Sequence, residues 1–219
     1  GGVLEQRGDA IGVVEGVVGQ RRFSIQVDGQ PNHAGTTPMT LRQDALVAAS
    51  RIVLAVESMA RQHPGDPVAT VGRLEVWPNA ANVVPGSVAL TVDLRDVNSV
   101  VLDQLVAELM QQVERIGAET GCPIQLEPQF EVEPTAAADG VMAAIVSAAE
   151  DLGLSHSHLP SRASHDAQEI GRRWPMGMIF VPSRGGLSHS AKEFTSDEQC
   201  WAGAAVLLGT LQRLDRELS

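Results

Sequence analysis

The sequence predicts a mixed α/β protein in which a split β-α-β (ferredoxin-like) domain is inserted into a second α/β domain. Within the 219 residues, strand and helix patterns follow the order β-α-β-β-α-β over 21–133, and both helical patterns carry one apolar stripe. After Pro134, helical and strand patterns alternate, as is typical of α/β layer folds. The chain is therefore expected to combine a complete inserted domain with part of a larger one.

The first half of the inserted domain contains a strand, a loop and a helix. In "RRFSIQVDGQ", apolar and polar residues alternate from Phe23 to Val27, and an Asp-Gly turn closes the strand. After the loop "PNHAGTTPM", Thr40 and Gln43 have the spacing of a capping box, which predicts a helix over about 41–62. The predicted inward stripe of this helix is Ala45, Ala48, Ala49, Ile52, Val56 and Met59.

The second half contains two strands, a helix and a fourth strand. The strands are "PVATVGRLEVW" (67–77), "SVALTVDLRDV" (87–97) and "PIQLEPQFEV" (123–132), and the helix spans about 99–119. Gly121 lies just past the helix, where glycine commonly ends one. The apolar face of the helix is predicted to be Leu102, Leu105, Leu109, Val113 and Ile116, with Val106 beside them.

Residues 1–20 and 134–219 are assigned to the larger domain. Residues 1–20 are strand-like, and 134–219 predict a helix over about 139–152, a helical turn near 166–172 and a buried strand, "MGMIFV" (176–181). "SHSHLPSRASHDA" is predicted to be a loop, and a capping box of Thr195 and Glu198 is predicted to start a last helix ending near 215. These strands are too few for a complete layer fold, so the first half of this domain is expected to lie outside the sequence.

Composition excludes several classes of function. A net charge of −11 without any basic run argues against nucleic acid as a partner, because phosphate binding needs clustered Lys and Arg. No apolar run approaches the roughly 18 residues of a membrane span, and no secretory leader is visible. Cys122 and Cys200 have no metal-site spacing and are predicted to be buried free thiols, which favours a reducing, cytoplasmic location.

Three of the six histidines lie in loops of the kind that present functional groups. These are His33 in "PNHAGTTPM", His165 in "SRASHDA" and His189 in "GGLSHSAKEF". The structural alternative for His33 is a turn histidine with local hydrogen bonds. His63, at a helix end, and His156 and His158, in a polar segment, are predicted to have structural roles.

Two further residues allow both a structural and a functional interpretation. Asn82 in "NAANVVPG" is a common turn residue, and Arg95 in "VDLRD" stands between two aspartates that can pair with it. Functionally, an arginine is a planar fork that grips a carboxylate through two hydrogen bonds. A hydrolytic metal site needs about three protein ligands for each zinc, and the chain has no convincing set. The residues alone therefore indicate a ligand-binding α/β protein.

Taken together, five motifs resemble those of a known family. "PNHAGTTPM", "NAANVVPG", "VDLRD", "SRASHDA" and "GGLSHSAKEFT" are similar, in order and spacing, to the metal-dependent amidohydrolases that include N-carbamoyl-L-amino-acid hydrolases, allantoate amidohydrolases and β-ureidopropionases. That family is related to dinuclear zinc aminoacylases and exopeptidases. The resemblance covers essentially the whole chain and implies a zinc-exopeptidase-like catalytic domain (1–20 and 134–219) with an inserted lid or dimerisation domain (21–133).

The resemblance also implies roles for particular residues. His189 corresponds to a metal ligand, Arg95 to the arginine that grips the substrate carboxylate, and His33 to a residue that touches the substrate and stabilises an oxyanion. The other implied substrate contacts are Asn82, His165, Gly185 and Gly186. Arg162 and Ser164 stand where the family favours small residues, which changes the expected pocket.

The implied activity is hydrolysis of a linear amide bond in a small ureido or amide substrate with a free carboxylate. It would use two divalent ions (zinc, manganese or cobalt) in a homodimer formed through the inserted domain, without nucleic acid or membrane partners. The family's other metal ligands and its general base have no counterpart here, so the chain is expected to be a C-terminal half that is inactive alone. Two alternatives stay open: an exopeptidase or aminoacylase of the same fold, and a non-catalytic, dimerising ligand-binding module.

Overall fold

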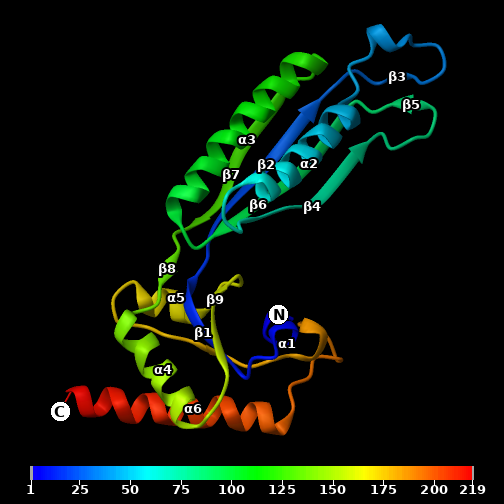
Figure 1. Cartoon of the computed structure of the whole chain (residues 1–219). Helices are drawn as coiled ribbons and strands as arrows, with labels where there is room; N and C mark the ends of the chain where they lie inside the picture. The colour runs from blue at the N-terminus through cyan, green and yellow to red at the C-terminus, as the bar shows by residue number, and fades with distance from the viewer. Residues whose placement is uncertain (1, 219) are drawn as a thin grey trace. The chain divides into compact units, whose positions relative to one another are not determined.

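The computed structural model describes residues 2–218, and side chains through Arg216. The chain divides into two compact units (Figure 1). Unit 1 comprises the residues up to Val18 and those from Pro134 onward, and unit 2 comprises Gly19–Glu133. Both contain helices and sheet, so the predicted mixed α/β class is confirmed.

Unit 2 is built on a four-stranded antiparallel sheet. Its strands, in the spatial order β4-β6-β2-β7, are β4 (Val68–Trp77), β6 (Ser87–Asp96), β2 (Gly19–Asp28) and β7 (Ile124–Val132). Along β6, buried and half-buried residues alternate strictly, which is the pattern of a sheet with one covered face. The predicted order of long strands and helices is confirmed here.

Two helices, α2 (Ala45–Gln62) and α3 (Ser99–Thr120), cover that face (Figure 1). All six residues predicted for the stripe of α2 are buried, and five of the six on α3 are, the exception being half-buried Val106. They form one core with the inward residues of β2 and β6. Unit 2 therefore has a complete hydrophobic core.

The start of α2 differs from its prediction. The Asp44 carboxylate accepts hydrogen bonds from the backbone N–H groups of Leu46 (3.0 Å) and Val47 (3.1 Å), so the helix begins at Ala45. The predicted Thr40–Gln43 capping box is wrong because Met39–Leu41 form a separate 3₁₀ turn, η1. The end of α3 follows the prediction, with Gly121 in the left-handed region at φ +66°.

Unit 2 also contains a two-stranded ribbon that the sequence pattern did not reveal. Its strands are β3 (Asn32–His33) and β5 (Val83–Val84). Each lies within a segment predicted to be a loop. Two-residue strands are too short for a period-2 pattern, so only the pairing makes them visible.

Unit 1 is built around β1 (Ile11–Val17), which pairs with three other strands. It is antiparallel to β8 (Thr135–Ala136) and β10 (Ile179–Phe180), and parallel to β9 (His156–Ser161). The helices of this unit are α1 (Val3–Arg7), α4 (Asp139–Asp151), α5 (Asp166–Gly171) and α6 (Asp197–Leu218), and Arg184–Gly186 form a 3₁₀ turn, η2.

Several expectations for unit 1 are corrected. His156–Ser161 form a strand rather than a loop, because their backbone pairs with β1 although the side chains lack an apolar alternation. A short helix, α1, precedes β1 in the segment predicted to be strand-like. The last helix starts after Ser196 rather than Thr195: Ser196 and Gln199 exchange the reciprocal hydrogen bonds of a capping box, at 2.9 and 3.3 Å.

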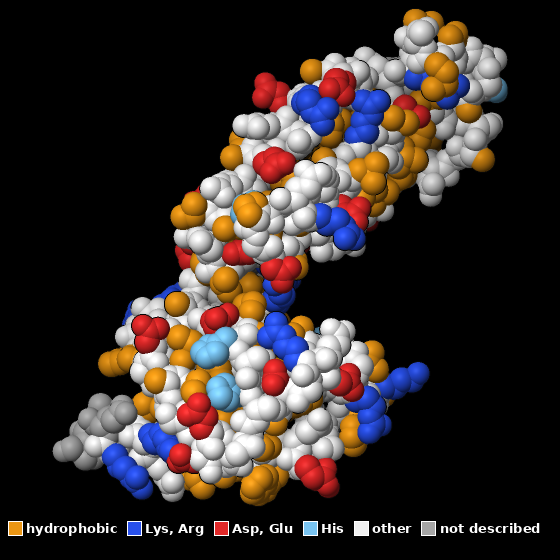
Figure 2. All heavy atoms as spheres, viewed as in Figure 1, with side chains coloured by type: hydrophobic (Ala, Val, Ile, Leu, Met, Phe, Trp, Pro, Cys, Tyr) orange, Lys and Arg blue, Asp and Glu red, His pale blue; other side chains and the backbone are white. Residues whose placement is uncertain are grey.

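Helix α6 packs one face on α4 and leaves large apolar side chains at the surface (Figure 2). Trp201, Leu208 and Leu211 are each more than half exposed. Cys200 is exposed, which corrects the expectation of two buried thiols, whereas Cys122 is buried; both are free. None of the helices over residues 2–218 combines the length and apolar character that crossing a membrane requires.

Candidate functional site

The ribbon of unit 2 brings His33 and Asn82 together. His33 pairs with Val83 across β3 and β5, and the Ala34 N–H donates to the Asn82 carbonyl at 2.9 Å. Both side chains are exposed. Two of the predicted substrate contacts therefore lie beside each other at one end of unit 2.

The imidazole of His33 is oriented by its own loop. Its Nδ1 atom accepts hydrogen bonds from the N–H groups of Gly35 (3.0 Å) and Thr36 (3.2 Å). A ring nitrogen that accepts cannot carry a hydrogen, so in the neutral ring the hydrogen is on Nε2. The turn interpretation and the functional one are thus compatible, because local bonds occupy Nδ1 and leave Nε2 as a donor.

Arg95 lies in β6 and forms an ion pair with Asp93. Its Nε donates to the Asp93 carboxylate at 2.7 Å, and Arg22, opposite on β2, donates to the same carboxylate at 2.9 and 3.1 Å. Burial alone would raise the pKa of Asp93, but hydrogen bonds from Arg95, Arg22 and Gln20 outweigh it and hold the pKa below its ordinary value. Asp93 therefore stays ionised and fixes the direction of the Arg95 guanidinium.

One copy of unit 2 does not bring Arg95 to the His33 ribbon. Ser87 starts β6 near the ribbon, and Arg95 is eight residues further along the extended strand. At 3.3 Å per residue, that is a separation of about 26 Å. A small substrate does not span this distance.

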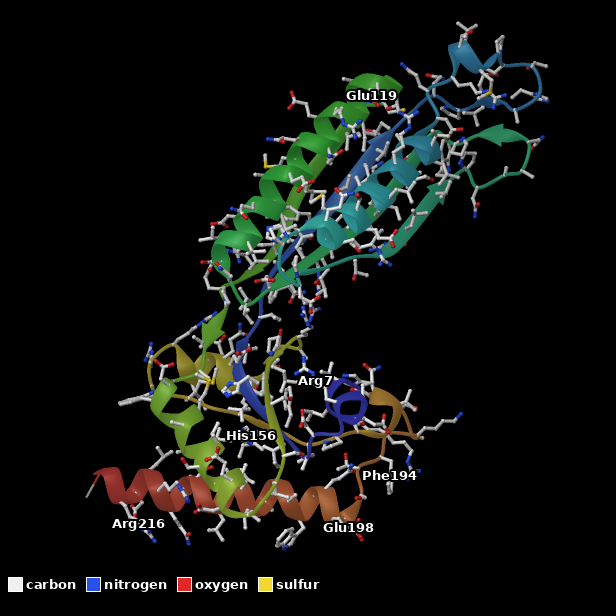
Figure 3. All side chains as sticks on the ribbon, viewed as in Figure 1. Arg7, Glu119, His156, Phe194, Glu198 and Arg216 are labelled. Carbon is white, nitrogen blue, oxygen red and sulfur yellow. The ribbon has the colours of Figure 1, made fainter. Side chains whose placement is uncertain are left out.

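In unit 1, His189 lies in a loop whose base is closed by several contacts. The Arg184 N–H donates to the Phe194 carbonyl (2.9 Å), and the Arg184 guanidinium lies 4.2 Å from the centre of the Phe194 ring, a cation–π contact. The Thr195 hydroxyl donates to the Pro182 carbonyl at 3.0 Å. Figure 3 labels Phe194 at this base and Glu198 at the following helix. We call residues 184–194 the His189 loop.

Within this loop the backbone of His189 is held, but its ring is not. The residue has φ +53°, in the left-handed region that costs an ordinary side chain about 1 kcal/mol. Its N–H donates to the Glu193 carboxylate at 3.0 Å. Over the part of the chain that the structure describes, neither ring nitrogen of His189 has a hydrogen bond, so both are available to a ligand.

The two glycines of the loop are joined to the N-terminal segment. Gly185 and Gly186 have φ +62° and +64°, which glycine adopts without strain. The Gly185 N–H donates to the Glu5 carboxylate at 2.7 Å, and a Cβ built on Gly2 would lie 3.7 Å from the Gly186 Cα. Segments about 180 residues apart in sequence thus meet at the loop.

The remaining histidines are placed by the helices and strands that carry them. His165 precedes α5, and its Nδ1 accepts the Ala167 N–H at 3.0 Å, so it acts as the helix cap. His156 (labelled in Figure 3) and His158 lie on β9 opposite Ile11 and Val13. His63 ends α2, with Nε2 3.2 Å from the Gln104 side-chain oxygen.

The described residues do not form a complete metal site. Among residues 2–218 there is no group of three or more His, Cys, Asp or Glu side chains placed to hold an ion. His189 by itself fits one ligand position, because an imidazole without hydrogen bonds is a common zinc donor. An ion would need its other donors from elsewhere.

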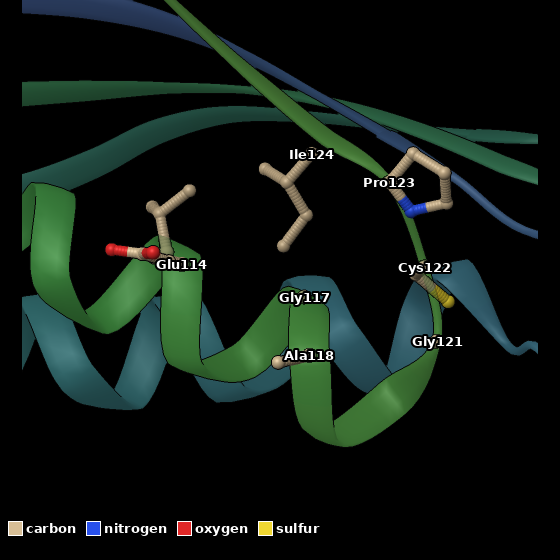
Figure 4. A pocket seen from close by; sticks show the side chains of 8 residues that line it. Glu114, Gly117, Ala118, Gly121, Cys122, Pro123 and Ile124 are labelled. Carbon is tan, nitrogen blue, oxygen red and sulfur yellow. The ribbon is translucent and has the colours of Figure 1, made fainter.

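A hollow of about 380 Å³ in unit 2 lies away from every predicted site residue (Figure 4). It lies between the end of α3 and the start of β7, and its ionisable side chains are Glu114 and Cys122. Burial raises the pKa of the Cys122 thiol, which keeps it protonated and poorly nucleophilic. Its chemistry does not suggest a catalytic site.

The residues that hold the loops of His33 and His189 were not among the site residues predicted from the sequence. Arg42 donates to two backbone carbonyls of the turn after His33, and Glu193 and Glu5 each accept one backbone N–H group. No residue spacing marks such bonds in advance. Glu193 stood four positions after His189, but its partner is a backbone N–H exposed only by the turn.

The fold and these motifs define a member of an established hydrolase family. Residues 2–213 match the model of "Peptidase family M20/M25/M40", and the chain belongs to this family. The M20 family is generally dependent on divalent metal ions.

Particular relatives are similar over nearly the whole chain. An allantoate amidohydrolase of Bacillus subtilis is 38% identical over 98% of this chain and 52% of its own length, and an N-carbamoyl-L-amino acid amidohydrolase of Geobacillus stearothermophilus has the same identity and coverage. The solved structure of a hydantoinase/carbamoylase family amidase from Burkholderia multivorans is 42% identical, with TM-score 0.94, over 97% of this chain and 52% of that one. The chain thus spans about half the length of these relatives.

Proposed function

We propose that the whole protein to which this chain belongs is an amidohydrolase that cleaves the linear C–N bond of an N-carbamoyl-L-amino acid or of allantoate. The observation that carries this proposal is 38% identity over 98% of the chain to relatives of both names. Both substrates combine a ureido group with a carboxylate, so one site chemistry serves either. Hydrolysis adds one water and releases an amine, ammonia and carbon dioxide.

In this proposal His33 stabilises the transition state. Attack on the ureido carbonyl places negative charge on its oxygen, and the Nε2–H of His33 donates to that oxygen. A donor of this kind commonly lowers the barrier by about 3 kcal/mol. The fixed Nδ1 of His33 supports the role, because the ring does not have to reorient during the reaction.

His189 is the residue of this chain proposed to hold a metal ion, with His165, Gly185 and Gly186 lining the substrate side. A bound divalent ion would supply a water of near-neutral pKa and polarise the carbonyl. The other donors, and the base that takes the proton from water, are proposed to come from parts of the whole protein outside these residues. The 219-residue chain alone is therefore proposed to be inactive, in line with the missing donor cluster among the described residues.

The substrate carboxylate is assigned to Arg95, and the His33–Asn82 ribbon to a second copy of the protein. The separation of about 26 Å between Arg95 and the ribbon supports this division, since one unit 2 cannot place both on one small molecule. The site would then be complete only in a homodimer.

Strand β4 is proposed to form the dimer contact. It is an edge of the sheet, contains no proline, and exposes Leu74 and Trp77, whereas the opposite edge, β7, is interrupted by Pro128. Antiparallel pairing of two β4 strands centred on Leu74 would set Arg73 against Glu75 of the second copy. In the single chain these two side chains already form an exposed ion pair of 2.7 Å.

A charge exchange tests this contact. Arg73→Glu is expected to weaken the dimer at least tenfold, because it places two carboxylates against each other. Adding Glu75→Arg to the same chain restores opposite charges and is expected to restore dimerisation, as measured by sedimentation equilibrium. A double variant as weak as the single one refutes the register.

The activity is tested on the whole protein with a substrate panel. Ammonia release from N-carbamoyl-L-amino acids and from allantoate is measured beside amine release from N-acyl amino acids and dipeptides. Turnover confined to the last two refutes the proposal in favour of an aminoacylase or peptidase. Arg95→Lys is expected to raise KM about tenfold or more through loss of the bidentate grip, with exposed Arg61→Lys as the matched control.

A further inference from the structure

The loop that carries His33 is held by one arginine. Arg42 Nη2 donates to the Ala34 carbonyl at 2.6 Å, and its Nε donates to the Thr37 carbonyl at 3.1 Å. Within residues 2–218, Arg42 forms no ion pair, unlike Arg22, Arg51, Arg61, Arg73 and Arg95. Its half-buried guanidinium is thus committed to two carbonyls of this turn.

Those two carbonyls flank the amides that orient the imidazole. The Thr37 N–H and hydroxyl both donate to the His33 carbonyl, at 3.2 and 2.7 Å, and close the turn on itself. This closure points the N–H groups of Gly35 and Thr36 at His33 Nδ1. The bonds form one connected set that runs from Arg42, through the turn, to the ring.

We infer that Arg42 is a positioning residue that fixes neutral His33 in the Nε2–H tautomer. Two N–H donors on Nδ1 exclude a hydrogen there, and a rigid turn is needed for both to converge on one atom. A guanidinium supplies two donors in a fixed plane, which matches two carbonyls three residues apart. Lysine, with one compact ammonium on a flexible stem, does not reproduce that fork.

The tautomer and the role of Arg42 in it follow from unit 2 alone. Only the use of the Nε2–H donor on a substrate oxyanion rests on the function proposed above. His33 then donates as a neutral imidazole, and Arg42, nine positions away, determines which ring nitrogen carries the hydrogen.

¹⁵N NMR of the 219-residue chain, with no substrate or metal, tests the inference. The imidazole ¹⁵N shifts of His33 report the tautomer, and amide exchange of Gly35 and Thr36 reports the turn. In the wild-type chain we expect hydrogen on Nε2 alone and slow exchange of both amides. In Arg42→Ala we expect the shifts to move toward those of exchanging tautomers and amide exchange to become about tenfold faster, the effect of losing about one hydrogen bond.

Matched variants separate a positioning role from a general one. Arg42→Lys is expected to fall between wild type and Arg42→Ala, and Arg61→Ala, which removes an exposed guanidinium from the same unit, is expected to leave His33 unchanged. If Arg42→Ala does not fold, Arg42→Lys and Arg42→Gln decide by the same two readouts. Hydrogen on Nδ1 in the wild type, or unchanged shifts and exchange in the Arg42 variants, overturns the inference. An inactive whole enzyme with the expected shifts refutes only the proposed function.

Discussion

Residues 33–44, here called the His33 loop, and the His189 loop are held in place by side chains of opposite charge. Each presents an exposed histidine, and each runs into a capped helix, α2 after Asp44 and α6 after Ser196. The first is held by a cation, Arg42, which binds carbonyls. The second is held by carboxylates, Glu5 and Glu193, which accept backbone N–H groups.

This difference decides what each imidazole can do. In the first loop the bonds reach the ring itself, so Nδ1 is occupied and one donor remains. In the second loop the bonds stop at the backbone, so among the described residues both ring nitrogens of His189 are without a hydrogen bond, and either can offer the lone pair that a metal ion binds. A hydrogen-bond donor needs a fixed tautomer, whereas a metal ligand needs a free lone pair on one ring nitrogen.

The largest effect expected concerns the ring of His33. In the whole enzyme, His33→Ala is expected to lower kcat about a hundredfold with little change in KM, because the lost bond is made mainly in the transition state. His63→Ala, at the end of α2, serves as the control. Steady-state kinetics with an N-carbamoyl-L-amino acid or allantoate measure the effect. An unchanged kcat would show that His33 does not take part in the reaction.

Next in size are the caps at which the two loops end. Asp44→Ala and Ser196→Ala are each expected to lower the free energy of unfolding by about 1 kcal/mol, because each removes an acceptor for the first N–H groups of a helix. Thr40→Ala, at the position that the sequence pattern predicted as a cap, is expected to change it by less than about 0.5 kcal/mol. Urea denaturation distinguishes the two caps from Thr40, and equal losses for all three contradict the observed helix start.

Glu193 gives a smaller, local effect. Glu193→Ala is expected to speed amide exchange of His189 about tenfold by removing the acceptor of its N–H, with no change in global stability. Glu193→Gln keeps an oxygen at that place and is expected to restore most of the protection. Glu169→Ala, from an exposed ion pair on α5, is the control. If the amide exchange rate of His189 is equal in the wild type and in all three variants, the Glu193 carboxylate does not hold the loop.

Much of unit 2 could be predicted because its pattern is local. The stripes of α2 and α3 are buried as predicted, since a 3.6-residue period leaves one face for the core. Unit 1 was harder. Strand β9 contains two histidines, two serines and a proline, and is a strand because β1 offers a partner edge, which no local pattern records.

The residue types of the proposed site follow from the sequence motifs, but their geometry does not. The motifs led to the proposal of His33, Asn82, Arg95 and His189, yet nothing in their spacing showed that Arg95 and the ribbon lie at opposite ends of β6. The supporting residues, Arg42 and Glu193, act on backbone groups exposed only after the turns form. The sequence states which side chains are present, whereas the hydrogen bonds that orient them depend on the folded backbone.

The smallest effect expected is a pH-dependent contribution of Asp93 to stability, at the end of unit 2 away from His33. The pKa of Asp93 is lowered in the folded chain, so its ionised form stabilises unit 2 above the ordinary value of 3.8, and this contribution is lost as pH falls through the lowered value. Asp93→Asn is expected to remove a contribution of less than about 1 kcal/mol at neutral pH and to flatten the acid limb of the stability curve. The His33 ring shifts, measured at neutral pH, are expected to be identical in this variant and the wild type, because Asp93 lies near the Arg95 end of the strand. Altered His33 shifts in Asp93→Asn would show that the two ends of unit 2 are coupled, contrary to the independence expected from their separation along β6.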